Sequence, residues 1–374
     1  MGWSFQIGRL FGIPIRVHIT FFILPLIIWL GGSVRGAFMG GLTGVIFICA
    51  LFGCVVLHEL GHSIVARNYG IVVKDITLLP IGGVSNMERI PEEPRQELAI
   101  SIAGPAVSAG VFVVIAVLLG IGGLNPFSAP PMRDVTGHPM GFVGFLRQLM
   151  WINLILAIFN LVPAFPMDGG RILRAFLAEH MDYVRATQTA SVVGQAFAFL
   201  MGFVGLFLNP WLILVAIFVF MGAGQEEQQV RVRSVLRDVP AAAAMLTRFD
   251  ALAPEHTLRQ ALELASRGFQ HDFPVVRDGT VVGIITHEDL LRGLYESGLD
   301  RPVGEIMRTD LCPRSPDATL EVFYDDVAHG RCHIFPIISG GQLVGLVTPD
   351  SISRYIVTTT GHPTLDRQRL PLVE

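Results

Sequence analysis

The chain has 374 residues, of which 51% are hydrophobic and 16% are charged, and its formal net charge at pH 7 is −4. This composition is too apolar for an ordinary soluble protein, and the negative net charge argues against a nucleic-acid partner. Charged residues are sparse up to Gly224 and frequent after Glu226, so we predict a membrane domain at residues 1–224 followed by a soluble domain.

The membrane domain is predicted to be a polytopic α-helical bundle of about six transmembrane helices. We interpret the first as a retained signal anchor, because no convincing cleavage site follows it. Residues 71–90 are too short and interrupted to span a membrane, and we expect a small strand-and-loop element there. The predicted spans lie at about residues 17–31, 37–66, 98–124, 142–165, 191–208 and 210–223, and residues 168–185 are expected to form a further helix.

Basic residues predict the orientation. Under a six-span model most of them fall on one side of the membrane, and only Arg35 and Arg133 lie in loops on the other. The positive-inside rule then places both termini and the soluble domain in the cytoplasm of a cell-membrane protein. Because cytosolic proteins rarely keep disulfides, we expect reduced thiols at the four cysteines, Cys49, Cys54, Cys312 and Cys332.

The motif His58-Glu59-Leu60-Gly61-His62 lies in the second predicted span. Residues four apart share one face of a helix, so His58 and His62 can present two imidazoles to one metal ion. Glu59 is adjacent and can take a proton from a metal-activated water. Ionisable groups inside a membrane are costly and persist where they serve a function. We therefore predict a hydrolase with one Zn²⁺ in the bundle, rather than a chance match or a structural histidine pair.

A catalytic zinc site needs a third protein ligand. Asp168 follows the fourth predicted span, where Pro163 and Pro166 end the helix at the same end of the bundle as His58. We predict that Asp168 is this ligand, and its alternative role is a helix N-cap. Asn160 lies about one turn inside the same end, where its amide can donate to the oxyanion of an attacked peptide or form an interhelical hydrogen bond.

These motifs resemble the site-2 protease family of intramembrane metalloproteases. The resemblance rests on the histidine motif, on residues 160–170 and on Ala103-Gly104-Pro105 in the third span, and it covers about residues 8–224. It implies the same zinc ligands and the same general base, acting later as general acid. It also implies that the substrate is a transmembrane segment of another protein, cleaved near the surface of the lipid bilayer in regulated intramembrane proteolysis. The family usually has asparagine where this chain has Ser108, so a polar contact with the substrate is not carried over.

The soluble domain contains a repeat. Residues 245–291 recur with a constant offset of 62, so that Phe273-Pro274 corresponds to Phe335-Pro336. Each copy is expected to have a helix, a β-hairpin and a second helix, which gives an α/β domain. We predict a linker at residues 225–244, a first repeat at 245–294, a second repeat at 304–357 and a tail at 358–374.

This repeat resembles a tandem pair of cystathionine-beta-synthase (CBS) domains. In that family a Gly-hydrophobic-hydrophobic-Thr-x-x-Asp pattern binds adenine nucleotides, and the segment from Gly283 to Asp289 matches it. The resemblance implies that Gly283, Thr286, Asp289 and Thr348 bind ATP, ADP or AMP. The second copy departs from the pattern, because Ser351 stands at the position of Asp289. The alternative is that the pair only forms a homodimer or a spacer.

Two other functions fit parts of the sequence. A channel or transporter can carry the same regulatory module, but it leaves the histidine motif unexplained, and the two halves of the bundle show no repeat symmetry. A catalytically silent relative that binds transmembrane helices has no need of Glu59. We therefore predict a zinc-dependent membrane endopeptidase with a nucleotide-responsive cytoplasmic module.

Overall fold

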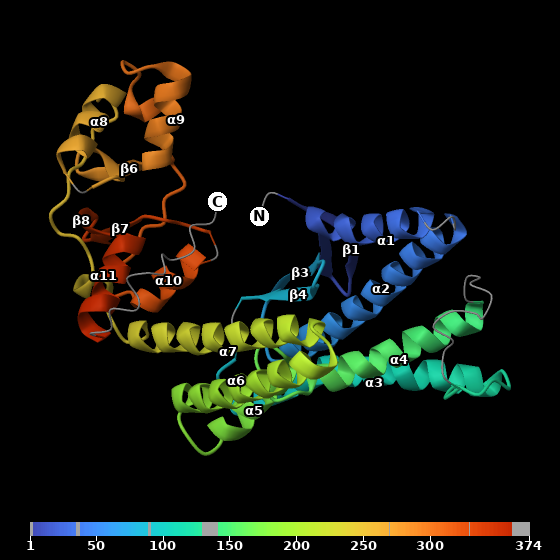
Figure 1. The fold of residues 1–374 in the computed structure, drawn as a ribbon. Coiled ribbons are helices and arrows are strands. Elements are labelled where there is room, and N and C mark those ends of the chain that lie inside the picture. Colours follow the sequence, from blue (N-terminus) through green and yellow to red (C-terminus); the bar gives the residue numbers. More distant parts are fainter. Residues whose placement is uncertain are drawn as a thin grey trace. The chain divides into compact units, whose positions relative to one another are not determined.

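The computed structural model describes residues 3–34, 38–88, 91–128, 141–268, 270–328 and 330–360 (Figure 1). The chain divides into two compact units, residues 1–228 and 229–374, and each is described by itself. Arg35 and Arg133, on which the predicted orientation partly depends, lie outside the described residues, as do residues 361–374 of the predicted tail.

The chain begins with four short elements: β1 (Ser4–Leu10), β2 (Ile13–His18), the 3₁₀ helix η1 (Ile19–Phe22) and α1 (Ile23–Val34). β1 and β2 pair antiparallel, and the helix predicted from residue 17 starts only after them, so its predicted start is wrong. The reason is a pattern of period two, since Ile13, Ile15 and Val17 are buried on one face of β2. His18 ends the strand and caps η1 by accepting the backbone N–H of Thr20.

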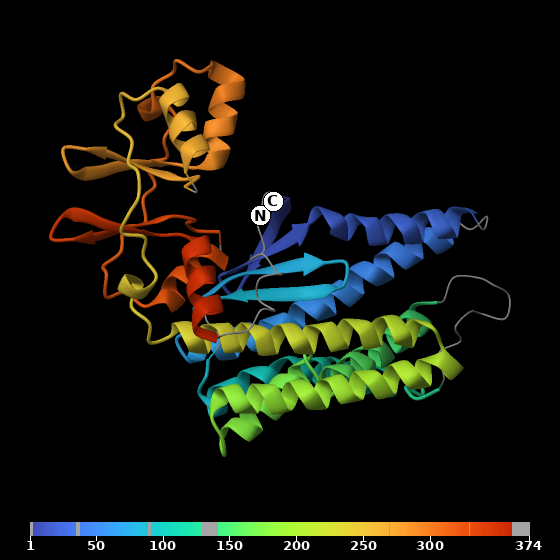
Figure 2. The same cartoon turned by 60° about the vertical axis from the view of Figure 1, so that its left-hand side comes forward.

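The strand-and-loop element predicted at residues 71–90 is confirmed. β3 (Val73–Leu79) and β4 (Gly82–Met87) form an antiparallel hairpin, and β3 pairs in parallel with β2. The resulting four-stranded sheet has the order β1-β2-β3-β4, so β4 is an edge strand. Figure 2 shows the β3–β4 hairpin beside α2 (Phe38–Asn68), on which the sheet packs. The buried apolar side chains between them are Ile13, Ile15, Val17, Phe21, Phe52, Val56, Leu60, Ile76 and Leu78.

The remaining helices of the bundle are α3 (Pro94–Ile121), α4 (Phe142–Asn160), α5 (Asp168–Ala178), α6 (Tyr183–Leu208) and α7 (Trp211–Leu236). In the described part of the chain, four helices are long and apolar enough to cross a membrane, namely residues 42–68 of α2 together with α3, α4 and α6. The polytopic helical fold is thus confirmed, whereas the count of six spans is not.

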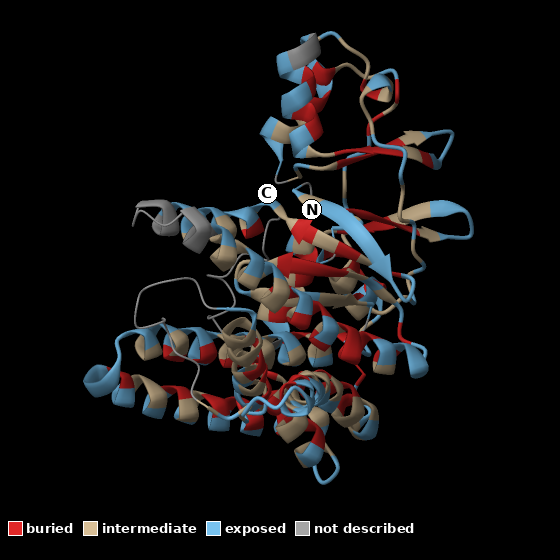
Figure 3. Cartoon of the chain, turned by 90° about the vertical axis from the view of Figure 1, so that its right-hand side faces the viewer, coloured by how far each residue is buried: buried red, intermediate tan, exposed pale blue. Residues whose placement is uncertain are grey.

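Large apolar side chains cover the outside of this bundle. In α6, Phe199 is 76% exposed and Phe207 is 75% exposed, and exposed residues recur along the outer faces of the helices (Figure 3). A soluble protein rarely presents apolar surface on this scale, whereas helices that face lipid do. The surface therefore agrees with a membrane-embedded bundle.

Two glycines allow α2 and α3 to approach closely. A Cβ atom on Gly61 would lie 2.8 Å from the carbonyl oxygen of Ala103, and one on Gly104 would lie 2.7 Å from Nε2 of His58. Real Cβ atoms essentially never come this near to another heavy atom. Glycine at both positions therefore brings α3 against the histidine motif, as small residues do at helix contacts in membranes.

The second unit confirms the predicted repeat. The first copy contains η2 (Ala241–Ala243), α8 (Leu258–Arg267), β5 (Phe273–Arg277), β6 (Thr280–Ile285) and α9 (His287–Ser297). The second copy contains η3 (Val303–Glu305), α10 (Leu320–Ala328), β7 (Phe335–Ser339), β8 (Gln342–Val347) and α11 (Pro349–Thr360). Every element of the second copy begins 62 residues after its counterpart. The hairpin turns lie at Asp278-Gly279 and Gly340-Gly341, where all four residues have positive φ.

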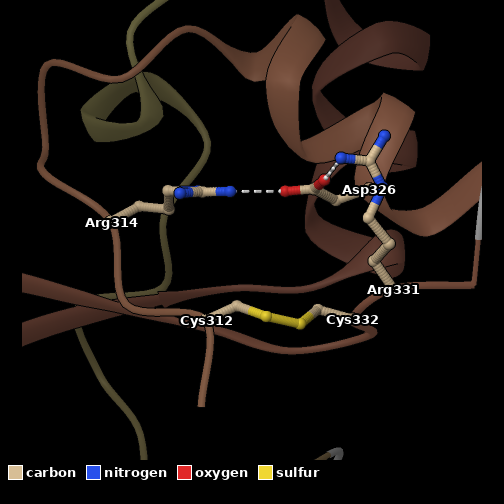
Figure 4. Close-up of a disulfide and its surroundings, with 5 residues drawn as sticks. All are labelled: Cys312, Arg314, Asp326, Arg331 and Cys332. Atoms are coloured by element: carbon tan, nitrogen blue, oxygen red, sulfur yellow. Dashed lines mark hydrogen bonds and ion pairs between the residues drawn. A yellow bond between two sulfur atoms is a disulfide. The ribbon is translucent and has the colours of Figure 1, made fainter. Parts of the chain in front are cut away.

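In each copy the same two positions are linked to one another, but the kind of bond differs. In the first copy the backbone N–H of Asp250 donates to Oε1 of Gln270 (2.8 Å), and Nε2 of Gln270 donates to the carbonyl oxygen of Asp250 (2.9 Å). The corresponding residues of the second copy, Cys312 and Cys332, form a disulfide beside the paired Asp326 carboxylate (Figure 4). The prediction that all cysteines are reduced is therefore wrong. The intervening α10 brings the two Cα atoms to 6.5 Å, within disulfide range, although their sequence separation is 20.

Candidate active site

His58, His62 and Asp168 converge at one point inside the bundle. The Nε2 atoms of the two histidines lie 3.2 Å apart, and Oδ2 of Asp168 lies 3.3 Å from that of His58 and 3.2 Å from that of His62. Tetrahedral zinc with bonds of about 2.0–2.1 Å holds its ligand atoms about 3.3–3.4 Å apart, so these donors fit zinc. Within the described residues this is the one group of three or more potential ligands whose donor atoms lie within 4.8 Å of one another.

Helix α5 places Asp168 beside the histidines. The N-cap of α5 is Met167, and Asp168 is the first helical residue, so the alternative role of Asp168 as an N-cap is wrong. Burial alone would raise the pKa of the Asp168 carboxyl, but its hydrogen bonds with His58 and His62 hold that pKa well below the ordinary value. The carboxyl is therefore ionised, as a metal ligand must be.

Glu59 is bonded to the sheet and is not part of the ligand group. Its Oε2 accepts a hydrogen bond from Oγ of Ser85 in β4 (2.7 Å). Gly83 leaves room for the Glu59 side chain, because a Cβ atom there would lie 2.7 Å from Cγ of Glu59. The hydroxyl of Ser63 lies 3.2 Å from that of Ser85. This position beside the ligand group, but outside it, suits a base that acts on water; the contact with Ser85 has no signal in the sequence.

Neither asparagine of α4 belongs to the ligand group. Asn160 is half-buried at the end of α4, near the turn that leads to Asp168, and its role toward an oxyanion stays a prediction. Asn153 is fully buried, and its Nδ2 donates to the carbonyl oxygen of Leu149 within the same helix (2.8 Å). Cys54 is buried among apolar side chains and is absent from the ligand group, which agrees with a packing role.

A buried ion cluster, which the sequence did not predict, holds α5 in place. Arg174 has no exposed surface, and its guanidinium donates to Glu97 of α3 and to Glu226 of α7, the latter at 2.6 Å. The guanidinium carbon also lies 5.0 Å from the ring of Phe165 and 4.9 Å from that of Tyr183. Burial alone would lower the pKa of Arg174, but the two carboxylates raise it above the ordinary value. The helix that carries Asp168 is thus tied to two others.

In the second unit, the predicted nucleotide residues cap helices. Oγ1 of Thr286 donates to Oδ2 of Asp289 (2.6 Å) and accepts the backbone N–H of Asp289 (3.2 Å) at the start of α9. Arg308 donates to both carboxylate oxygens of Asp289, at 2.8 and 3.0 Å. In the second copy, the backbone N–H of Ser351 donates to Oγ1 of Thr348 (3.3 Å). Asp289 is therefore already bonded, and its contact with a ribose stays a prediction.

Gly283 has a packing role that is repeated in the second copy. A Cβ atom on Gly283 would lie 2.7 Å from Cγ of Met307, and one on Gly345 would lie 3.1 Å from Cγ of Met245. Glycine thus leaves room on β6 for the segment around Met307, and on β8 for the segment around Met245. This crossing explains the glycine of the pattern without a bound nucleotide.

Comparisons with known proteins agree with both halves of this description. The model of peptidase family M50 matches residues 46–201, and the CBS domain model matches residues 236–296. Zinc metalloprotease MJ0392 of Methanocaldococcus jannaschii is 35% identical over 359 residues, which cover 95% of this chain and 96% of that protein. The structure of a site-2 protease from M. jannaschii aligns with 60% of this chain and 95% of its own, at 40% identity and a TM-score of 0.43. CBS domain-containing protein YhcV of Bacillus subtilis is 30% identical over 105 residues, 28% of this chain and 75% of YhcV.

Proposed function

Because the chain belongs to peptidase family M50, the site-2 protease family of zinc metalloproteases, we propose that it cleaves a transmembrane segment of another membrane protein. Its class as a zinc-dependent protease follows from the family, whereas the substrate and the regulated intramembrane proteolysis are our proposal. The observation that carries it is the zinc-sized triangle of His58, His62 and Asp168 inside an apolar helical bundle. A channel or transporter has no use for that triangle.

Each polar residue of the site has a role in this proposal. His58, His62 and Asp168 hold one zinc ion, which when bound polarises the scissile carbonyl and acidifies a water molecule. Glu59 takes a proton from the attacking water and delivers it to the leaving amide nitrogen. Asn160 donates from its amide to the developing oxyanion. One carboxylate thus performs both proton transfers.

The substrate has to be extended where it is cut. In a transmembrane helix the carbonyl groups are bonded within the helix, so a stretch of it must unfold before a peptide bond can be attacked. Among the residues that the structure describes, β4 has a sheet neighbour on one side only, and it carries Ser85, which is bonded to Glu59. A substrate segment that pairs with the free edge of β4 would regain its backbone hydrogen bonds beside the base.

Two variants test the assigned roles. We expect Glu59→Gln to retain zinc and lose turnover, because Glu59 acts on water and does not ligate metal. Asp168→Ala should lose both zinc and turnover, and Glu179→Gln, at an exposed site, should lose neither. Zinc content and cleavage of a helix-destabilised transmembrane substrate are measured on the purified chain. Full zinc occupancy in Asp168→Ala contradicts its role as ligand, and cleavage of soluble peptides alone contradicts the proposed substrate class.

The CBS pair is proposed to bind an adenine nucleotide and to change the access of substrate to the zinc site. Two features support this: the pattern from Gly283 to Asp289, and the single helix α7, which continues across the division between the two units at Gln228. Binding requires Asp289 to exchange Arg308 for ribose hydroxyls. The effect is limited to the differential affinity for two states, about 1–3 kcal/mol or 5–150-fold.

Calorimetry on the detergent-solubilised chain tests nucleotide binding with ATP, ADP and AMP. Asp289→Ala should weaken binding strongly, whereas Ser351→Ala is the matched control in the second copy and should change it little. If all three nucleotides fail to bind at millimolar concentration, the CBS pair is left with the alternative role of a homodimer interface.

We also propose that both termini and the CBS pair lie in the cytoplasm of a cell-membrane protein, on the basis of the distribution of basic residues. This location exposes Cys312 and Cys332 to the glutathione pool, which keeps most cytosolic thiols reduced. A cysteine introduced at the exposed Glu263 of α8, labelled with an impermeant thiol reagent in intact and opened cells, determines the side of the membrane. Labelling from outside contradicts the proposed orientation.

A further inference from the structure

Both histidines of the metal triangle are held from behind by the same helix, α3. Nδ1 of His62 lies 2.7 Å from the carbonyl oxygen of Ile100, and Nδ1 of His58 lies 2.9 Å from Oγ of Ser108. Ile100 is 4% exposed and Ser108 is 1% exposed. Each imidazole therefore has one nitrogen toward Asp168 and the other against a buried oxygen of α3.

The chemistry of these two oxygens differs. A histidine that binds metal through Nε2 carries its proton on Nδ1, which is then a hydrogen-bond donor. The carbonyl oxygen of Ile100 can only accept, so it holds His62 in this tautomer. The hydroxyl of Ser108 can accept or donate, and beside a metal-bound His58 it has to accept. Ser108 thus accepts the Nδ1–H of His58, as the backbone carbonyl of Ile100 accepts that of His62. Because Ser108 uses its side chain, the contact can be tested by substitution.

We propose that Ser108 is a positioning residue of the metal centre, which accepts Nδ1–H of His58 and holds that imidazole in the tautomer and orientation that zinc needs. The side chain is enclosed between α2 and α3 rather than exposed to a substrate. This inference rests on the zinc ligands assigned under the proposed function. Ser108, which stands where the family usually has asparagine, thereby has a role at the metal centre.

The expected effect is on zinc affinity. Loss of the partner behind a ligating histidine typically weakens metal binding about 10–100-fold, because the ring is no longer oriented and its N–H is left without an acceptor. A serine that only stabilised the contact between α2 and α3 would lower the thermal stability of the metal-free protein and leave its affinity for zinc unchanged. The two measurements together separate these roles.

The sharpest test compares Ser108→Thr with Ser108→Val. Threonine and valine have nearly the same shape, and each has one heavy atom more than serine, so the packing strain is similar and the main difference is a hydroxyl in threonine against a methyl group in valine. Zinc affinity is measured by competition with a chromophoric chelator on the full chain in detergent, and metal-free thermal stability is measured alongside. Ser108→Thr should bind zinc within a few-fold of the natural chain, and Ser108→Val about 10–100-fold more weakly.

Two further variants complete the comparison. Ser108→Ala adds no atom and should weaken zinc binding like Ser108→Val. Ser191→Ala is the matched control, because Ser191 of α6 is equally buried and its Oγ donates to the carbonyl oxygen of Ala223 (2.9 Å) in α7. It should lower stability without changing zinc affinity. Equal zinc affinity in Ser108→Thr and Ser108→Val overturns the role of Ser108, whereas a natural chain that binds no zinc overturns the proposed metal centre itself.

Discussion

Substitution of Gly104 by alanine tests the geometry of the metal centre directly. The new methyl carbon would lie 2.7 Å from Nε2 of His58 and closer still to Nε2 of His62, whereas ordinary contact begins at 3.4 Å. The imidazoles would have to move by at least 0.7 Å, but zinc–nitrogen distances are held within about 0.2 Å. We therefore expect the loss of a ligand and at least about 100-fold weaker zinc binding.

The control comes from the same helix. A Cβ atom on Gly110 of α3 would have nothing within 4 Å, so Gly110→Ala should keep zinc affinity. Alanine is favoured over glycine in a helix by about 1 kcal/mol, so neither variant should weaken α3 itself. Zinc affinity by chelator competition and thermal unfolding with and without zinc are the measurements. A Gly104→Ala chain that binds zinc as tightly as Gly110→Ala refutes the close approach of α3 to the ligands.

Three further predictions concern stability. Arg174→Met should destabilise the bundle by about 3–5 kcal/mol, because it removes the guanidinium that pairs with the buried Glu97 carboxylate, whereas Arg185→Met at an exposed pair should cost less than about 1 kcal/mol in the same denaturation assay. The pKa of Asp289 is lowered, since hydrogen bonds from its neighbours outweigh burial, so the stability that it adds is present above about pH 4 and lost below. The difference in melting temperature between the natural chain and Asp289→Asn should therefore shrink as the pH falls through that range. Replacing Cys312 and Cys332 by serine opens a loop with a sequence separation of 20 and should cost about 3 kcal/mol, and thiol titration with and without reductant checks the bond.

The convergence of His58, His62 and Asp168 was predictable because its signals are local. Two histidines four apart share a helix face whatever the fold, and a proline-rich turn before Asp168 marks a helix end. The sheet was half predictable: β3 and β4 lie in a segment too short to span. The last two residues of β2 were included in a predicted helix, because the alternation of β2 is short and continues into an apolar run, and no element was predicted for β1 or for the rest of β2. The elements of the second unit could be predicted from the repeat, because two segments with the same residue pattern at a constant offset adopt the same fold.

What the sequence did not reveal depends on contacts between distant residues. The partners of Arg174 lie 77 and 52 residues away, and Ser85 lies 26 residues from Glu59. Cys312 and Cys332 were assigned as thiols from the expected compartment, although only the fold determines their distance. The role of Ser108 needed the crossing of α2 and α3, which no spacing along the chain encodes.

The two CBS copies differ in the bond that links corresponding positions, and this difference makes their local flexibility unequal. The Asp250–Gln270 bonds of the first copy lie near the surface and contribute about 0.5–1.5 kcal/mol each, so thermal fluctuation opens them repeatedly. The disulfide between Cys312 and Cys332 prevents the same local opening in the second copy unless it is reduced. Amide protons near Asp250 should thus exchange with solvent earlier than those near Cys312. We therefore expect local opening in the first copy, while the second copy stays rigid at the corresponding position.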